Sequence, residues 1–222
     1  RGSVDLTSSA ADITSARRDV VNIGIPADCT NFNPWSFGGP GGNAAIWPLY
    51  QPLGYYIYSD DSFGEGKFYP GLAKNVTYAD DGMSVSVELF DYIYDWQGNH
   101  ITADDAIYSY NTSTLVWPEQ TEIVKELVKT GDYSFDFILQ RPLRFGDYEG
   151  LVRGLVVSKT AFENSKDEMH TDPVGTGPYK LTKHTSGYMF TYEKVENHWQ
   201  TDKSMLHPRD MGNVNTINWY VI

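Results

Sequence analysis

The segment Asp172–Tyr179 constrains the fold more than any other stretch of this sequence, because glycine and proline fill half of it. Gly175 and Gly177 permit backbone angles that are closed to other residues. Pro173 and Pro178 fix φ and lack an amide donor. The segment therefore predicts a rigid, shaped loop, and a strand follows it. Such a loop either contacts a ligand or holds the fold together.

Charge and cysteine content exclude several classes of function. The formal net charge of -12 argues against a nucleic-acid partner, because acidic side chains repel phosphates. One cysteine, Cys29, cannot form an intramolecular disulfide. No apolar run reaches the roughly 18 residues that a membrane-spanning helix needs. The hydrophobic fraction of 41% is enough for a core, and the aromatic fraction of 14% also suits a recognition surface.

The first strand and the loop after it form a candidate binding region. Residues Asp19–Ile25 alternate and are β-branched, which predicts a strand that ends at Pro26. The polar and aromatic loop Ala27–Trp35 then lies past the carboxyl end of that strand, where open α/β sheets bind ligands. An ordinary surface loop explains the same residues equally well. Residues 1–18 are rich in Ser, Thr, Ala and Asp and predict a flexible tail or a cloning remnant.

A second glycine-rich run, at residues 38–42, does not support nucleotide binding. A P-loop requires Lys followed by Ser or Thr after the last glycine, whereas Asn43 follows here. The run therefore predicts a flexible turn. The next residues predict a short helix over Ala44–Leu53, with Pro48 in its first turns or at a break, and then a strand at Tyr55–Tyr58.

Residues 74–102 carry the strongest β pattern. Residues Met83–Leu89 alternate apolar and polar, and an Asp-Gly turn at Asp81-Gly82 separates them from the preceding strand, which predicts a hairpin. Thr102 then suits the N-cap of a helix, with Asp104 and Asp105 in its first turn. A catalytic carboxylate pair is the alternative for these two acids, but helix capping explains both.

The remaining chain predicts alternating short elements. We expect helices over Pro118–Lys129 and Lys159–Asn164, a helical tendency at residues 146–154, strands at Asp132–Leu139, Leu155–Ser158 and Ile217–Ile222, and a hairpin formed by residues 179–183 and 188–195.

No pattern in the sequence indicates catalysis, a metal or a cofactor. The five histidines include no pair at the i, i+4 spacing of a helical zinc site, and one cysteine cannot form a cysteine cluster. There is no Gly-x-Ser-x-Gly elbow. We expect Cys29 to be inert, and the Thr176 hydroxyl to bond its own backbone, although it could instead bond a substrate. No catalytic residue, metal ligand or cofactor is therefore predicted.

A series of short motifs in a fixed order resembles the bacterial extracellular solute-binding proteins of the oligopeptide, dipeptide and nickel class (family 5), the receptors of ABC importers. The resemblance covers roughly residues 19–222. The motifs that carry it are Tyr69–Ala73, Ala79–Gly82, Gln97-Gly98, Thr102–Asp105, Pro173–Tyr179 and Val195–Trp199. The chain departs from the family pattern at Phe90, where Arg or Lys is commoner, and at Gln97, where Asp is commoner. Neither position threatens the fold.

This resemblance implies a fold and a role. The expected fold is mixed α and β: a periplasmic-binding-protein-like type II lobe with a largely antiparallel mixed sheet flanked by helices. Residues 19–222 would form the N-terminal lobe (domain I), with the second lobe absent. The protein would bind oligopeptides or a similar small solute outside the membrane, periplasmic or lipid-anchored as a lipoprotein. It would act as a monomer and deliver the solute to ABC permease subunits.

The resemblance also directs the choice of site residues. The candidate ligand contacts are Thr30, Asn31, Phe32, Asn33 and Trp35 of the first loop, together with Trp47 and Tyr50. The loop Gly175–Tyr179, which comprises Gly175, Thr176, Gly177, Pro178 and Tyr179, is expected to shape the fold beside the cleft. A hydrolase, or a sensor or interaction module on the same fold, is the alternative function.

Overall fold

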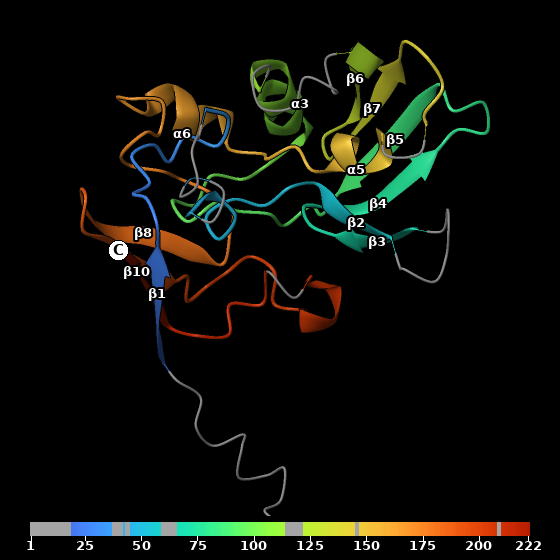
Figure 1. Cartoon of the computed structure of the whole chain (residues 1–222). Helices are drawn as coiled ribbons and strands as arrows, with labels where there is room; N and C mark the ends of the chain where they lie inside the picture. The colour runs from blue at the N-terminus through green and yellow to red at the C-terminus, as the bar shows by residue number, and fades with distance from the viewer. Residues whose placement is uncertain are drawn as a thin grey trace, which may run out of the picture.

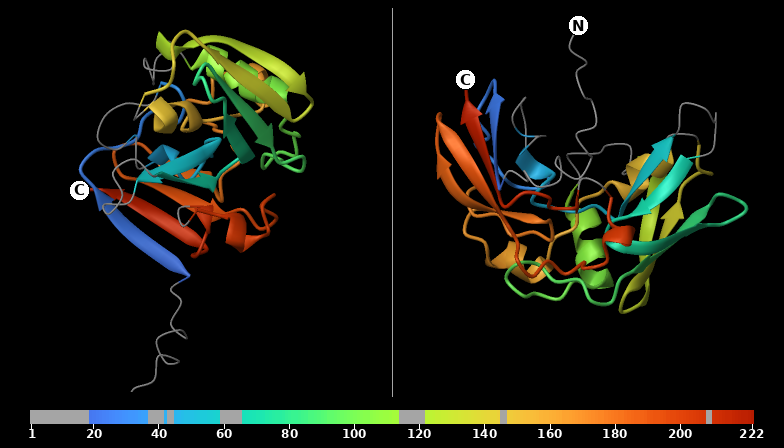
Figure 2. Two further views of the ribbon diagram at one scale, coloured as in Figure 1. Left: turned by 90° about the vertical axis from the view of Figure 1, so that its right-hand side faces the viewer. Right: turned by 90° about the horizontal axis from the view of Figure 1, so that it is seen from below.

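The computed structural model describes residues 19–36, 42, 45–58, 66–113, 122–144, 147–207 and 210–222. Their strands form three sheets, two with four strands and one with two. The mixed α/β class predicted from the sequence is confirmed, although the strands are divided among separate sheets. The two larger sheets stand at opposite ends of the molecule, with helices and loops between and beside them (Figures 1 and 2).

The mixed sheet joins the first strand to the last. Its order is β1-β10-β9-β8, and β1 pairs with β10 in parallel while the other pairs are antiparallel. The predicted first strand, last strand and final hairpin are confirmed. The bounds are β1 Val20–Ile25, β8 Tyr179–Thr185, β9 Met189–Lys194 and β10 Thr216–Val221.

The antiparallel sheet has the order β4-β5-β7-β6. The predicted hairpin is its first pair, because β4 and β5 are antiparallel neighbours. Val85, Val87 and Leu89 of β5 point into the core, as the alternation predicted, and helix α3 packs beside β6 and β7. The bounds are β4 Ala73–Tyr78, β5 Ser84–Leu89, α3 Ala103–Thr112, β6 Val124–Gly131 and β7 Ser134–Leu139.

The helix expected over Pro118–Lys129 is wrong where the chain is described, because β6 occupies residues 124–131. Register irregularities between Val124 and Glu126 and between Lys129 and Gly131 interrupt its pairing with β7. A bulge inserts an extra residue, so Val124 and Leu127, three positions apart, both pack toward the core. A spacing of three is also typical of a helix face. The bulge therefore gives the apolar residues of β6 a spacing that predicts a helix. Residues 118–121 lie outside the described residues.

Smaller elements connect the two sheets. The helix expected over Ala44–Leu53 is shorter than predicted, because residues 47–49 form a turn around Pro48. The strand expected at Leu155–Ser158 is reduced to a single bridge between Leu155 and Pro52. The helix at Lys159–Asn164 is confirmed as α6. The other bounds are β2 Gly54–Tyr58, β3 Gly66–Pro70, α5 Asp147–Val152 and the 3-10 helix Lys203–Met205.

Two hydrophobic cores lie under the two large sheets. One is centred on Phe135 and Phe137 of the antiparallel sheet, and the other on Phe32, Tyr50 and Phe190 beside the mixed sheet. The expected flexible tail and the glycine-rich turn lie largely outside the described residues. Within those residues, no helix combines the length and apolar character needed to cross a membrane.

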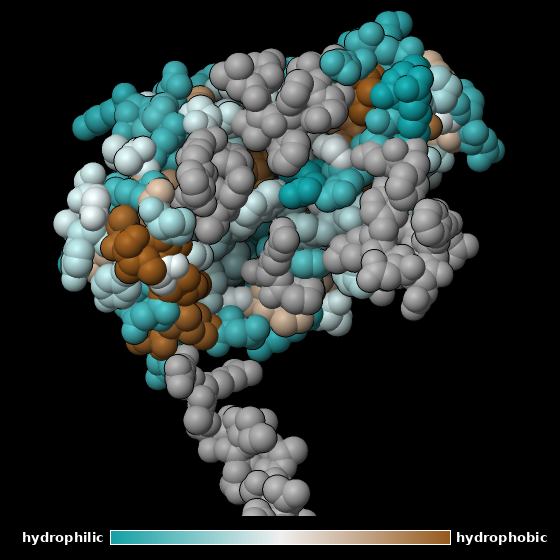
Figure 3. Space-filling view, viewed as in Figure 1, coloured by the Kyte–Doolittle hydropathy of each residue, from teal (hydrophilic) through white to brown (hydrophobic). Residues whose placement is uncertain are grey.

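The face seen in Figure 3 is mainly hydrophilic over the described residues, with an apolar area along the β1 edge of the mixed sheet. Val20 at the start of β1 and Ile222 after β10 are 44% and 86% exposed. β1 is the edge strand of this sheet among the described strands. The loop at the carboxyl end of β1 leads away from that edge toward α6 (Figure 1).

Candidate functional site

The loop after β1 is held by its own asparagines. Asn31 Oδ1 accepts a hydrogen bond from the Asn33 amide at 2.8 Å, and Asn31 Nδ2 donates to the Ser36 carbonyl at 3.0 Å. Asn33 Oδ1 accepts from the amides of Trp35 at 2.7 Å and Ser36 at 3.0 Å. Asparagine side chains stabilise turns in this way. The loop is therefore a series of closed turns.

The same loop is fastened to segments far away in the sequence. Trp35 Nε1 donates to the Leu155 carbonyl at 3.1 Å, and the Phe32 amide donates to the His170 carbonyl at 3.0 Å. Asn33 Nδ2 donates to the Glu168 carbonyl at 2.7 Å. These bonds satisfy buried polar groups that would otherwise destabilise the fold. They position the exposed rim of the loop against the turn at residues 165–171.

Asp28 ties the loop to the final hairpin. Its carboxylate lies 3.2 Å from His184 Nε2 of β8 and accepts the Gly187 amide at 2.8 Å. Burial alone would raise the pKa of Asp28, but the hydrogen bonds from Gly187 and His184 and the charge of His184 outweigh it, and the pKa lies below its usual value. This contact could not be predicted from the sequence, because Asp28 and His184 carry no local motif.

The predicted ligand contacts divide into accessible and buried residues. Thr30 is exposed, and Asn31 and Trp47 are half-buried, with the Arg153 guanidinium 5.3 Å from the Trp47 ring centroid. The others lie in the core beside the mixed sheet. These buried residues are Phe32, Asn33, Trp35 and Tyr50, none more than 5% exposed. The structure thus places Tyr50 against the first loop and Trp47 against the same hydrophobic core, with only part of the predicted set at the surface.

Tyr50 contacts the loop after β1 from within the core beside the mixed sheet. Its hydroxyl donates to the Phe32 carbonyl at 3.0 Å, and its ring is completely buried. Burial raises the pKa of Tyr50 well above its usual value, so the hydroxyl keeps its proton and remains a donor.

The Gly175–Tyr179 loop packs directly against the chain at residues 48–50. The Gly177 amide donates to the Leu49 carbonyl at 2.9 Å, and the Tyr179 amide donates to the Pro48 carbonyl at 3.2 Å. A Cβ on Gly175 would lie 2.1 Å from the Leu49 carbonyl oxygen. The loop is buried throughout, from Pro173 to Tyr179.

Two expectations about this loop are corrected. Gly175 and Gly177 do not have positive φ; among the described glycines that property belongs to Gly82, Gly98, Gly187 and Gly212. Close backbone approach is the reason for the glycines. The Thr176 hydroxyl does not bond its own backbone either, because Thr176 Oγ1 is buried without a hydrogen-bond partner among the described residues.

One carbonyl of this loop, that of Thr176, contacts the neighbouring side chains of His198 and Trp199. Trp199 Nε1 lies within hydrogen-bond distance of the Thr176 carbonyl at 3.1 Å and of Gln51 Oε1 at 2.8 Å. His198 Nε2 also contacts the Thr176 carbonyl, at 2.9 Å. Burial lowers the pKa of His198 below its usual value. His198 and Trp199 of the Val195–Trp199 motif therefore stabilise the Gly175–Tyr179 loop.

Cys29 is poorly suited to nucleophilic chemistry. It is 1% exposed, and its Sγ lies 3.3 Å from the Asn31 carbonyl. Burial raises the pKa of the thiol to about 11, so little thiolate forms near neutral pH. Within the described part of the chain, no group of three or more His, Cys, Asp or Glu side chains could hold a metal ion.

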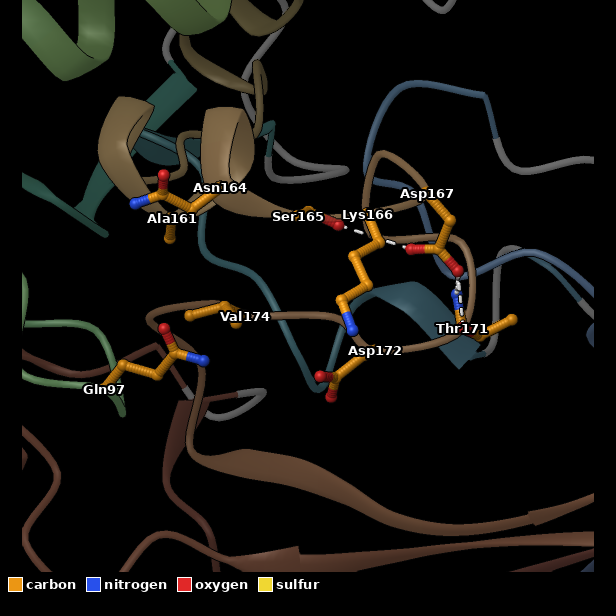
Figure 4. A pocket seen from close by; sticks show the side chains of 9 residues that line it. All are labelled: Gln97, Ala161, Asn164, Ser165, Lys166, Asp167, Thr171, Asp172 and Val174. Carbon is orange, nitrogen blue, oxygen red and sulfur yellow. Dashed lines mark hydrogen bonds between the residues drawn. The ribbon is translucent and has the colours of Figure 1, made fainter.

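A polar pocket of ≈ 260 Å³ is lined by residues of the 165–172 turn, of α6 and of the loop at Gln97. Ala161 and Val174 contribute its apolar surface. Side chains of Gln97, Asn164, Lys166 and Asp172 line the hollow (Figure 4). No signal in the sequence indicated this pocket, because its residues come from a turn, a short helix and two loops.

The mixed α/β fold is that of the type II periplasmic binding proteins, to whose solved structures this chain is similar. The sequence matches the bacterial extracellular solute-binding proteins, family 5 (middle), over residues 67–222, well over half of the chain. The chain belongs to this family, and the resemblance found in the motifs is confirmed.

Two curated proteins illustrate the similarity. The uncharacterised protein YejA of Escherichia coli (strain K12) is 28% identical over 175 residues, covering 76% of this chain and 28% of YejA. The dipeptide-binding protein of the same strain is 21% identical over 200 residues, covering 77% of this chain and 36% of that protein. The chain thus spans about a third of the length of these curated relatives.

A solved structure shares the fold. The ABC-transporter-associated periplasmic binding protein DppA of Helicobacter pylori, in complex with a peptide, superposes with a TM-score of 0.74 at 19% identity. The match covers 95% of this chain and 44% of that one. At this identity the superposition shows a shared fold.

Proposed function

We propose that the protein is the solute-binding component of an ABC importer, which captures oligopeptides or a similar small solute and presents it to permease subunits. The observation that carries this proposal is the family membership over residues 67–222. Relatives that are a dipeptide-binding protein and a peptide-bound DppA support peptides as the solute class.

Residues 19–222 are proposed to form the N-terminal lobe of this protein. A second lobe would close over the solute at a hinge, as binding proteins of two lobes do. The exposed Thr30 and the half-buried Asn31 and Trp47 would contact the solute. The buried candidates, such as Phe32 and Tyr50, would hold the loop in place. An extended peptide would be held largely through its main chain.

Location and assembly belong to the same proposal. The protein would work outside the cytoplasmic membrane, in the periplasm or anchored by a lipid, and as a monomer. Its task would be binding without catalysis, which the buried Cys29 thiol with its raised pKa supports.

Native mass spectrometry of the protein purified from its own host tests the proposal directly. Peptides released from the purified protein would support it. A turnover of substrate that is lost on Cys29→Ala or Thr176→Ala would contradict it and favour the hydrolase alternative.

Calorimetry separates the role of the chain from that of a second lobe. The 222-residue chain alone encloses one side of a ligand, so we expect peptide binding weaker than about 1 μM. Tighter binding by the chain alone would contradict the two-lobe proposal. In the two-lobed protein, Thr30→Ala should weaken peptide binding, whereas Thr77→Ala, on the exposed outer face of β4, should leave it unchanged.

A further inference from the structure

The pocket beside α6 collects polar groups that the fold does not use. The side chains of Gln97, Asn164, Lys166 and Asp172 line it and make no hydrogen bond or ion pair with the described residues. In Figure 4 the Gln97 amide and the charged ends of Lys166 and Asp172 lie around the same hollow, whereas the Asn164 amide projects away from Lys166 and Asp172. Ligand sites are concave and carry a small number of polar groups that fix the orientation of the ligand, and this hollow has that arrangement.

Hydrogen bonds fix the turn that carries Lys166 and Asp172. Asp167 Oδ2 accepts hydrogen bonds from the Thr171 amide, at 3.1 Å, and from the Thr171 hydroxyl. The Met169 amide donates to Ser165 Oγ at 2.7 Å. Glu168 and Met169 have φ of 53° and 62°, which few residues other than glycine adopt. The turn between Lys166 and Asp172 is therefore a fixed frame.

The charges of the pocket match a zwitterion. Lys166 and Asp172 stand near each other on one side of the hollow, yet no ion pair joins these two described residues (Figure 4). A solute with adjacent ammonium and carboxylate groups would satisfy Asp172 and Lys166 together. A solute with a single charge would leave one of them unmatched. The amide of Gln97, on the opposite side, can donate and accept hydrogen bonds with a short polar side chain.

Size restricts the solute further. Sites for drug-sized molecules measure about 300–1,000 Å³, and this pocket, at ≈ 260 Å³, is smaller. The buried Ala161 and Val174 close its apolar side. A free amino acid fits this volume, and a longer peptide would extend into solvent.

We propose that this pocket is a second solute site, which binds a free α-amino acid with a short polar side chain. The site consists of residues of this chain alone and does not depend on the proposed transport role. It adjoins the first site, because the Glu168 and His170 carbonyls of the same turn accept hydrogen bonds from Asn33 and Phe32.

Titration of the 15N-labelled 222-residue chain with L-serine, followed by NMR, tests the proposal. Because Lys166 and Asp172 are exposed and solvated, we expect weak, saturable binding with a Kd on the order of 1 mM. Shift changes should centre on the amides of residues 165–174 and Gln97. N-acetyl-L-serine and L-serinamide each lack one charge and should bind at least about tenfold more weakly.

Substitutions assign the contacts. Lys166→Met and Asp172→Asn should each weaken L-serine binding about tenfold or more, with unchanged melting temperature, because both residues are exposed. Lys180→Met and Asp80→Asn remove exposed charges elsewhere and should leave binding unchanged. Absence of saturable shifts up to about 100 mM overturns the proposal. So do shifts centred on Thr30, equal binding of the blocked analogues, or indifference to Lys166→Met and Asp172→Asn.

Discussion

Positions 175 and 177 are glycine because residues 48–50 pack closely against them. A Cβ on Gly175 would lie 2.8 Å from Tyr50 Cδ1 as well as against the Leu49 carbonyl, and one on Gly177 would lie 2.4 Å from the Pro48 carbonyl oxygen. Backbone atoms are the obstacle, and they cannot move aside as a flexible side chain can. The loop and residues 48–50 therefore form one packed unit beneath the candidate site.

Alanine at either glycine should destabilise the protein. We expect Gly175→Ala and Gly177→Ala each to lower the free energy of unfolding by about 1–3 kcal/mol, through overpacking. Gly150→Ala is the matched control: the residue lies in α5, and a Cβ added there would meet no atom within 4 Å, so the change should stabilise by about 0.5–1 kcal/mol. Thermal melts measure both effects. An unchanged melting temperature combined with an altered solute preference would refute the structural role of the loop.

Thr176 and Ser109 provide a test of hydroxyl pairing. Both are buried, but Ser109 Oγ accepts the Val157 amide at 3.1 Å, whereas Thr176 Oγ1 has no partner among the described residues. Thr176→Val should leave stability unchanged or raise it by about 1 kcal/mol, because an unsatisfied buried hydroxyl is removed. Ser109→Ala should cost about 1–3 kcal/mol. Urea unfolding of the two variants compares them, and a large loss with Thr176→Val would reveal a missing partner.

At the level of elements, the two acids in the first turn of α3, Asp104 and Asp105, have different roles that the sequence alone did not separate. Asp105 Oδ2 accepts the Thr102 amide at 2.8 Å, and its Oδ1 accepts the Lys159 amide at 2.8 Å, joining the starts of α3 and α6. Asp104 forms only an exposed ion pair with Lys129. The first-turn role assigned from the sequence is confirmed, since these contacts are those of capping residues.

Asp105→Ala should therefore cost far more than Asp104→Ala. We expect a loss of about 2 kcal/mol or more for Asp105, because two helix starts lose a buried acceptor. Asp104→Ala should cost under about 1 kcal/mol, since exposed ion pairs contribute little. Denaturant titrations of the two variants measure the difference. Equal losses of unfolding free energy would contradict the proposed link between the starts of α3 and α6.

Elements with local signals could be predicted from the sequence, and elements set by distant contacts could not. The β4–β5 hairpin and α6 follow from an Asp-Gly turn and from a short helical run, and both are confirmed. β6 could not be predicted, because its bulges, which arise in pairing with β7, give it a helical spacing. A residue such as Leu155 meets Pro52 only in the folded chain.

The candidate site, too, could be predicted from the sequence only in part. The loop after β1 could be located from the end of a strand, but the division between exposed Thr30 and buried Phe32 depends on packing against the mixed sheet. The pocket at Lys166 and Asp172 could not be predicted, because a turn, a short helix and two separate loops create it. Sequence pattern thus indicates where a site begins, and tertiary contacts decide which side chains it presents.

At the scale of the whole molecule, carboxylates with lowered pKa values set the response to acid. Burial of Asp28 is outweighed by its bonds to Gly187 and His184, and the Arg141 guanidinium lowers the pKa of Asp147. Asp28 joins the first-strand loop to the final hairpin, whereas Asp147 lies in α5 and pairs with Arg141 at 2.6 Å. Each end of the molecule thus contains a carboxylate that is more acidic when folded.

We expect stability to fall as the pH drops below about 4, where unfolded aspartates take up protons. A carboxylate whose pKa is lowered by folding stabilises the protein above its unfolded pKa, and that contribution disappears as the pH falls through the folded pKa. Asp28→Asn should lower stability at neutral pH and reduce the further loss in acid, because one such group no longer titrates. Asp80→Asn, at an exposed turn, is the matched control for the change of side chain. Melting temperatures from pH ~7 to ~2 test this, and an equally steep acid loss in Asp28→Asn would show that the Asp28 contact does not contribute.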